Sequence, residues 1–214
     1  MKKSAIFGAF ALLASSQASA SYIETVTGAD MTDMSVTVTY SDASTETLLW
    51  QTLATDPGPD YQEGFVGGVF GSDWSLVQQG NTISETPADA SLPLGLWTFD
   101  FEFTGVGIQS IFIDAFAGNV VFDTAEGDAS ANGSGPGRGY LDDVDFAVAS
   151  YTNNVEDELF GGLLINGISD ELFAQSGTLE FLIDTDMVAV SAPATASIFA
   201  LGLAFIGFGR KKNA

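Results

Sequence analysis

The chain contains no cysteine and no histidine among its 214 residues. Without cysteine there are no disulfide bonds, so an extracellular domain of this sequence would have to be stable through its core alone. The two absences together exclude Cys–His and Ser–His–Asp catalysis and zinc sites built from thiolate or imidazole. Carboxylates, hydroxyls, aromatic rings and a few cations remain as sources of chemistry.

Basic residues are also scarce, with six Lys and Arg against 28 Asp and Glu. All the acidic residues lie between Glu24 and Asp186, where Arg138 is the single cation, so this segment has a formal charge of −27. Nucleic acids and anionic lipids are bound through clusters of Lys and Arg, and we therefore expect neither as a partner. We interpret most of the carboxylates as solubilising groups, and Arg138 as one half of a structural pair with an aspartate.

The N-terminus has the three parts of a secretory signal peptide. Lys2 and Lys3 are followed by an apolar stretch, Ala5 to Ala14, and then by Ala18-Ser19-Ala20. The apolar stretch is much shorter than the roughly 20 residues that a membrane span needs, and the small residues are typical of a signal peptidase site. We expect residues 1–20 to be removed after Ala20, with Ser21 as the mature N-terminus.

The segment from residue 21 to 190 shows strand periodicity. In "MSVTVTY" the residues Met34, Val36, Val38 and Tyr40 alternate with polar ones, and "WTFDFEFT" repeats the pattern with Trp97, Phe99, Phe101 and Phe103. Such alternation places the apolar side chains on one face of a strand. Further short β-branched or aromatic runs are separated by clusters such as "DPGPD" and "SANGSGPGRG", which are typical of turns.

Helical patterns are hard to find, and only "NVEDELFGGLL" (154–164) could supply a turn or two of helix. Eight to ten short strands with turn signals between them predict an all-β domain over residues 21–190. We expect an antiparallel β-sandwich with a jelly-roll-like topology.

Two acidic turns could bind a hard cation. "YLDDVDF" places Asp142, Asp143 and Asp145 after a glycine-rich stretch, and "FDTAEGDAS" contains Asp123, Glu126 and Asp128. Calcium takes six to eight oxygen ligands from loops of this kind, although neither stretch fits the EF-hand pattern. Calcium at Asp142, Asp143 and Asp145 is the candidate metal site; solvated acidic loops are the alternative.

The C-terminal residues 191–214 form a separate tail. No residue from Met187 to Gly209 is charged, and Pro193 separates a compact apolar piece, Ile198 to Phe208, from the rest. This piece predicts a C-terminal hydrophobic helix inserted in the inner membrane. The basic residues that follow would remain on the cytoplasmic side and orient it: Arg210, Lys211 and Lys212.

This tail resembles the C-terminal sorting signal of the PEP-CTERM proteins of Gram-negative bacteria. In that family a Val-Pro-Glu-Pro-Ser-Thr stretch precedes the membrane segment and is cut by a membrane-embedded exosortase. The corresponding letters here are Val190-Ser191-Ala192-Pro193-Ala194-Thr195, in which Pro193 and Thr195 match and the glutamate is missing. The resemblance implies transient membrane insertion, cleavage by an exosortase-like protease around Ala192, Pro193 and Ala194, and delivery to the cell envelope or the extracellular space. An ordinary single-span anchor is the alternative.

Three functions remain compatible with the sequence. The first is a non-catalytic surface or matrix protein with a structural or adhesive role in an exopolysaccharide layer. The second is a glycan-binding module in which an exposed tryptophan, Trp50, Trp74 or Trp97, stacks on sugar rings. The third is a glycoside hydrolase, which needs only two suitably spaced carboxylates. A chain with 28 carboxylates contains such pairs by chance, so composition cannot support this third function. We expect no enzyme and no catalytic residues.

Overall fold

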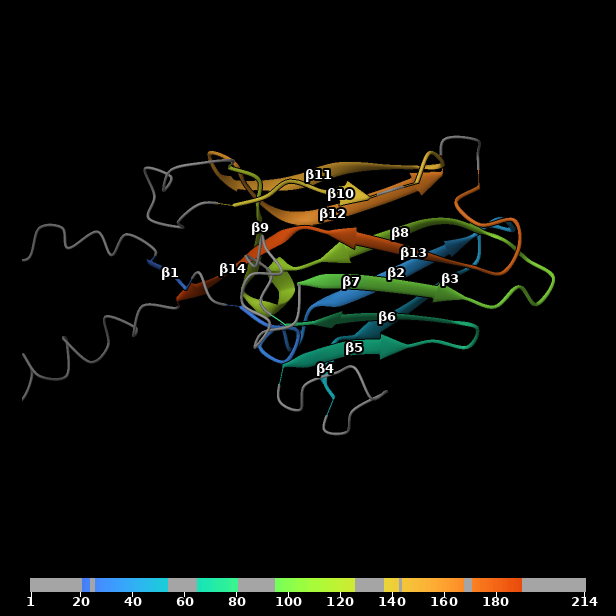
Figure 1. Cartoon of the computed structure of the whole chain (residues 1–214), viewed down its shortest axis with the longest axis horizontal. Coiled ribbons are helices and arrows are strands. Elements are labelled where there is room, and N and C mark those ends of the chain that lie inside the picture. Colours follow the sequence, from blue (N-terminus) through green and yellow to red (C-terminus); the bar gives the residue numbers. More distant parts are fainter. Residues whose placement is uncertain are drawn as a thin grey trace, which may run out of the picture. The chain divides into compact units, whose positions relative to one another are not determined.

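Figure 1 shows the computed structural model, which describes residues 21–23, 26–53, 65–80, 95–125, 137–142, 144–167 and 171–189. All of these residues belong to one unit, Ser21–Ala189. Several predicted features lie outside the described residues: Ala18, Ala20, Asp143, the stretch Ala192, Pro193 and Ala194, the hydrophobic helix, and Arg210, Lys211 and Lys212. Within the described ranges, no helix has the length and apolar character needed to cross a membrane.

The described residues form two antiparallel sheets, and the first of these contains eight strands. A central strand, β12 (Leu159–Gly167), pairs along one side with the edge strand β11 (Ala147–Glu156) and along the other side with both β8 (Ile108–Asp114) and β9 (Val120–Asp123). The short 3₁₀ turn η1 (Phe116–Gly118) separates β8 from β9. The remaining strands extend the sheet beside β8 and β9: β2 (Ser35–Tyr40), β3 (Thr45–Leu49), β14 (Asp184–Ala189) and β1 (Ser21–Ile23).

The second sheet contains six strands. Its order is β10 (Leu141–Asp142), β13 (Gly177–Leu182), β7 (Leu96–Phe101), β6 (Trp74–Gln79), β5 (Val66–Phe70) and β4 (Gln51–Thr52). Strands β5, β6 and β7 follow one another along the chain as a meander, whereas β13 joins β7 from a distant part of the sequence. The described part of the chain is therefore mostly antiparallel β structure in two sheets, in agreement with the predicted fold class.

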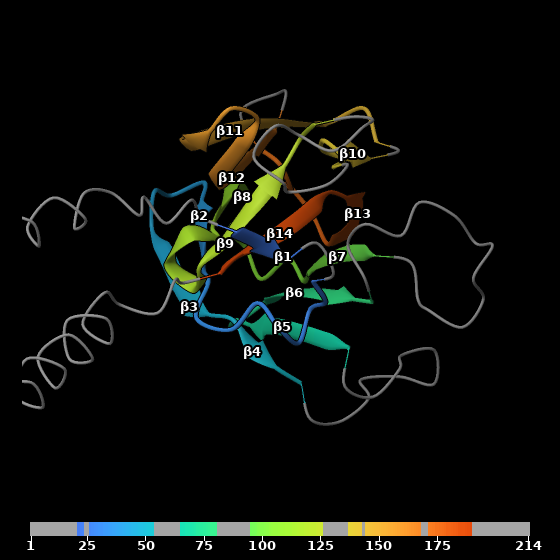
Figure 2. The same ribbon diagram turned by 90° about the vertical axis from the view of Figure 1, so that its left-hand side faces the viewer.

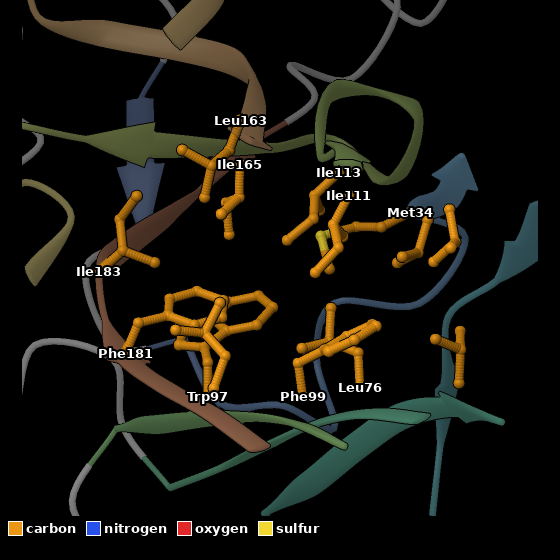
Figure 3. Close-up of a cluster of buried hydrophobic side chains, with 14 of the residues drawn as sticks. Met34, Leu76, Trp97, Phe99, Ile111, Ile113, Leu163, Ile165, Phe181 and Ile183 are labelled. Carbon is orange, nitrogen blue, oxygen red and sulfur yellow. The ribbon is translucent and has the colours of Figure 1, made fainter. Parts of the chain in front are cut away.

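The hydrophobic core lies between the two sheets. Figure 3 shows Ile111, Ile113, Leu163 and Ile165 of the first sheet facing Leu76, Trp97, Phe99 and Phe181 of the second. Trp97 stacks on Phe181 of its own sheet with ring centroids 5.7 Å apart, and reaches across to Phe122 of β9 at 6.4 Å. These large apolar side chains supply the stability that the chain cannot take from disulfide bonds.

The alternating pattern of "MSVTVTY" is confirmed, because Met34, Val36 and Val38 are all fully buried. The pattern of "WTFDFEFT" holds only as far as Phe101, where β7 ends. Phe103 lies beyond the strand and is 42% exposed, so its expected place in the core was wrong. A period-two pattern predicts the face of a residue only while the residue remains in the strand.

The expected helical turn at 154–164 was also wrong. These residues form the end of β11, the turn at Asp157 and Glu158, and the start of β12. The turn has a left-handed residue, Asp157 with φ 42°, and β11 has a register shift between Asn154 and Glu156. Pairing of β11 with β12 therefore overrides the helix propensity of the residues in "EDEL".

The two ends of the described unit lie side by side. Ser21 of β1 is the register partner of Ala189 of β14, and Figure 2 shows these two strands beside each other. Ser21 is the predicted mature N-terminus, and Ala189 is followed by Val190, after which the predicted sorting tail begins. The stretch without charged residues that starts at Met187 therefore begins within β14. There Met187 is the register partner of Val120 of β9 and of Ile23 of β1.

Candidate functional site

The three tryptophans are buried in the core. Trp50, Trp74 and Trp97 are 1%, 4% and 0% exposed. The Trp50 indole donates a hydrogen bond to the Gly28 carbonyl at 2.8 Å, and its ring lies 5.3 Å from that of Trp97. None of the three can therefore offer a ring face to a sugar at the surface, and the predicted role of tryptophan in glycan stacking was wrong.

A polar cluster at one end of the molecule joins the two sheets through Glu46 of β3. Its Oε2 accepts hydrogen bonds from Trp74 Nε1 of β6 at 2.7 Å and from the Ser72 amide at 3.2 Å, and its Oε1 accepts one from the Ser72 hydroxyl at 3.1 Å. Tyr40 of β2 lies beside it, with its hydroxyl 3.3 Å from Oε2. Glu46 thus satisfies several donors at a boundary where an unpaired donor would be costly.

These contacts also change the acidity of the cluster. Burial by itself would raise the pKa of the Glu46 carboxyl, but the hydrogen bonds from Ser72 and Trp74 outweigh it and lower that pKa. Burial and the hydrogen bond to Asp73 raise the pKa of Tyr40 far above its usual range. At ordinary pH Glu46 is consequently ionised and can accept hydrogen bonds, and Tyr40 is neutral and can donate one.

Asp73 connects this cluster to the neighbouring surface. Its Oδ1 accepts the Tyr40 hydroxyl at 2.7 Å and its Oδ2 accepts the Thr104 hydroxyl at 3.0 Å. The single Tyr40 proton cannot serve two carboxylates at once, and the shorter distance assigns it to Asp73 rather than to Glu46. The turn between β5 and β6 is therefore held from both sides.

An open groove of about 590 Å³ lies over this turn and the outer face of the second sheet. Its polar lining includes three carboxylates, Asp73, Asp100 and Glu102, and its apolar lining includes Phe70, which is 57% exposed. Asp100 is exposed, and its Oδ1 accepts a hydrogen bond from Thr178 at 2.6 Å. Sequence analysis missed this groove because its residues come from distant strands and lack a local motif.

The predicted calcium loop is only partly described. Asp142 of β10 is the register partner of the buried Phe181, and its Oδ1 accepts a hydrogen bond from the Val144 amide at 3.3 Å. Burial raises the pKa of the neighbouring Tyr140, and the Asp142 carboxylate adds to that shift. Asp145 is exposed, and Asp143 lies outside the described residues. Among the residues that the structure describes, no three acidic side chains are grouped so that they could hold a metal ion.

The second acidic turn begins at a different cluster. Asp123 of β9 and Asp184 of β14 are register partners, and both are 0% exposed, as is Asp186. The Arg138 amide donates to the Asp123 carbonyl and the Arg138 carbonyl accepts from the Asp184 amide, both at 3.0 Å. The single cation of the −27 segment therefore lies at the ends of the two strands that carry the buried carboxylates. Glu126 and Asp128 lie outside the described residues.

Comparisons with known proteins add no assignment to these sites. No protein-family model, no curated protein and no solved structure matches the chain.

Proposed function

We propose that this protein is exported, sorted at the cell envelope, and contributes structure or adhesion to a surface or extracellular polysaccharide layer without catalysing a reaction. The proposal combines the signal-peptide pattern before Ser21, the PEP-CTERM-like tail after Val190 and the acidic segment between them. Its processing partners would be a signal peptidase and an exosortase-like protease.

The observation that carries the non-catalytic part is the way in which Glu46 is used. Its carboxylate accepts hydrogen bonds from Ser72 and Trp74 and ties the two sheets together. A general acid needs a raised pKa, usually obtained by burial, whereas the pKa of Glu46 is lowered. This carboxyl therefore has the properties of a structural acceptor.

The glycoside hydrolase alternative finds little support in the groove. Asp100 and Glu102 are exposed at its surface rather than enclosed by apolar side chains. A glycosidase needs one carboxyl that stays protonated long enough to donate to the leaving group. An open groove with exposed carboxylates suits binding better than acid catalysis.

The finer description of the fold belongs to the same proposal. We take the two packed sheets as a β-sandwich, because one set of core side chains lies between them. In a jelly roll the chain crosses repeatedly from one sheet to the other, and here it does so from β7 to β8 and from β12 to β13. Strands β5, β6 and β7 instead follow one another within a single sheet, which is not a jelly-roll connection.

Fractionation of a producing culture tests the function. We expect the protein in the envelope, matrix or medium fractions, and we expect a deletion strain to form a less cohesive matrix. Recovery from the cytoplasm alone would contradict the proposal. Release of reducing ends from a polysaccharide by the purified protein would contradict its non-catalytic part.

A further inference from the structure

The outer face of the second sheet carries a row of four side chains across neighbouring strands. Phe70 of β5 is the register partner of Ser75 of β6, Ser75 is the partner of Asp100 of β7, and Asp100 is the partner of Thr178 of β13. All four line the groove of about 590 Å³. Since neighbouring strands are roughly 4.8 Å apart, the row is roughly 14 Å long, which matches a short extended oligosaccharide.

The middle of this row is polar and held in place. The Thr178 hydroxyl donates to Asp100 Oδ1 at 2.6 Å, which fixes the carboxylate and leaves its other oxygen as an acceptor. Asp73 on the adjoining turn is fixed by Tyr40 and Thr104. Side chains that are already ordered lose little conformational entropy when a ligand binds.

Exposed aromatic rings lie at both ends of the surface. Phe70 is 57% exposed on the β5 side. On the β13 side a second hollow, of about 360 Å³, shares Ser176, Gly177 and Thr178 with the groove and is lined by Phe146, which is 37% exposed. The Phe146 ring is braced edge-on by Phe173, with centroids 5.7 Å apart. An aromatic face combined with nearby polar acceptors suits a ligand that has both apolar C–H faces and hydroxyl groups.

Charge decides which ligand of this kind can bind. Among the residues that the structure describes, the lining of the groove includes Asp73, Asp100 and Glu102 and no basic residue. Phosphate, sulfate and uronate groups would be repelled by these carboxylates, whereas sugar hydroxyls can donate hydrogen bonds to them. We propose that this groove binds a neutral glycan chain laid across strands β5, β6, β7 and β13, with Phe70 stacking on a sugar ring and Asp100 accepting hydroxyl hydrogen bonds. The inference rests on the proposed function and gives it a binding surface.

Titration calorimetry on the full chain tests the site with defined probes. The probes are the neutral hexasaccharides of cellulose, amylose and mannan, with hexagalacturonate as the anionic comparison. We expect binding of at least one neutral hexasaccharide and none of hexagalacturonate at the same concentration. Phe70→Ala should weaken that binding about tenfold, the effect of losing one aromatic contact, and Asp100→Ala should weaken it by a similar factor.

Matched controls separate loss of the site from loss of the fold. Phe116→Ala removes another exposed phenylalanine, on η1, and Glu158→Ala removes an exposed carboxylate in the β11–β12 turn, so both should bind like the parent chain. Circular dichroism should show the same strand content for all four variants. Failure of every neutral probe at 5 mM or about equal binding of hexagalacturonate would overturn the inference. So would unchanged affinity in folded Phe70→Ala and Asp100→Ala.

The outcome is distinguishable from that of the proposed function. If the protein is recovered from the matrix but binds none of the neutral probes, the groove assignment fails and the structural role stands. If it binds a neutral probe through Phe70 but is never exported, the assignment of the groove stands and the proposed role in the matrix fails.

Discussion

The Trp74 indole of one sheet donates a 2.7 Å hydrogen bond to the Glu46 carboxylate of the other. Trp74 also stacks on Phe99 with ring centroids 5.9 Å apart, so the same side chain contributes to the core and to the polar cluster. The bond thereby fixes the β5–β6 turn, which forms one wall of the groove. Stability and the shape of the candidate binding surface depend on the same contact.

Replacing Glu46 should therefore destabilise the protein. In Glu46→Gln the amide can still accept from one donor, but the charge-assisted bonds to Trp74 and Ser72 are weakened. We expect the free energy of unfolding to fall by about 2 kcal/mol, the usual range for a hydrogen bond to a charged group. Urea denaturation measures the change, with Glu158→Gln as the control that should remain within about 0.5 kcal/mol of the parent. A Glu46→Gln variant as stable as the parent would contradict a structural role for this carboxylate.

The lowered pKa of Glu46 predicts a pH dependence. Because the folded-state pKa lies below the ordinary value of 4.5, this group contributes stability that is present above that value. The contribution is lost as the pH falls through the folded-state pKa. The difference in unfolding free energy between the parent chain and Glu46→Gln should thus be constant near neutral pH and shrink as the pH falls below about 4. A difference that grows on acidification would show that the sign is wrong.

Arg138 should be needed for folding of the β9–β14 region. Asp123 and Asp184 are fully buried register partners, and the Arg138 backbone hydrogen bonds to both. Arg138→Met removes the single cation of the segment from Glu24 to Asp186, which has 28 carboxylates, and we expect the free energy of unfolding to fall by about 3 kcal/mol. Thermal or urea unfolding measures it. The double variant Arg138→Met/Asp123→Asn should recover part of the loss, and equal stability of the two variants would argue against coupling between Arg138 and Asp123.

Salt should stabilise the domain through screening. The segment from Glu24 to Asp186 has 28 carboxylates and one Arg, and added ions reduce their mutual repulsion. Because Asp142 is half-buried in β10 while Asp145 is exposed, and the described residues contain no group of three acidic side chains that could hold a metal, we expect NaCl and CaCl₂ at matched ionic strength to raise Tm equally. If CaCl₂ raises Tm more than NaCl does, and if this difference disappears in Asp142→Asn, the result would instead support the predicted calcium site at Asp142, Asp143 and Asp145.

The sequence predicted those features whose signal is local. Alternation in "MSVTVTY" identified β2, because one strand with one buried face has a pattern of its own. Strand β14 was not predicted, because Asp184, Thr185 and Asp186 are polar residues and do not show an apolar alternation. Their full burial depends on pairing with β9 and on the backbone hydrogen bond between Asp184 and Arg138.

The candidate groove could not be predicted for the same reason. Glu46 and Trp74 are 28 residues apart, and Asp100 and Thr178 are 78 residues apart. Their contacts result from strand pairing and sheet packing, which no single window of sequence contains. The exposed position of Phe70 likewise follows from its place on the outer face of β5.

Intact mass spectrometry of the protein recovered from producing cells and from their medium tests the central claim most directly. The account predicts a mature chain that begins at Ser21 and ends near Pro193, with or without an added moiety at the new C-terminus. It also predicts that Pro193→Leu slows the second cleavage and that replacement of Arg210, Lys211 and Lys212 by Gln weakens retention before it. A chain that keeps Met1, or one that keeps its tail to Ala214 in cells that contain an exosortase, would contradict the account.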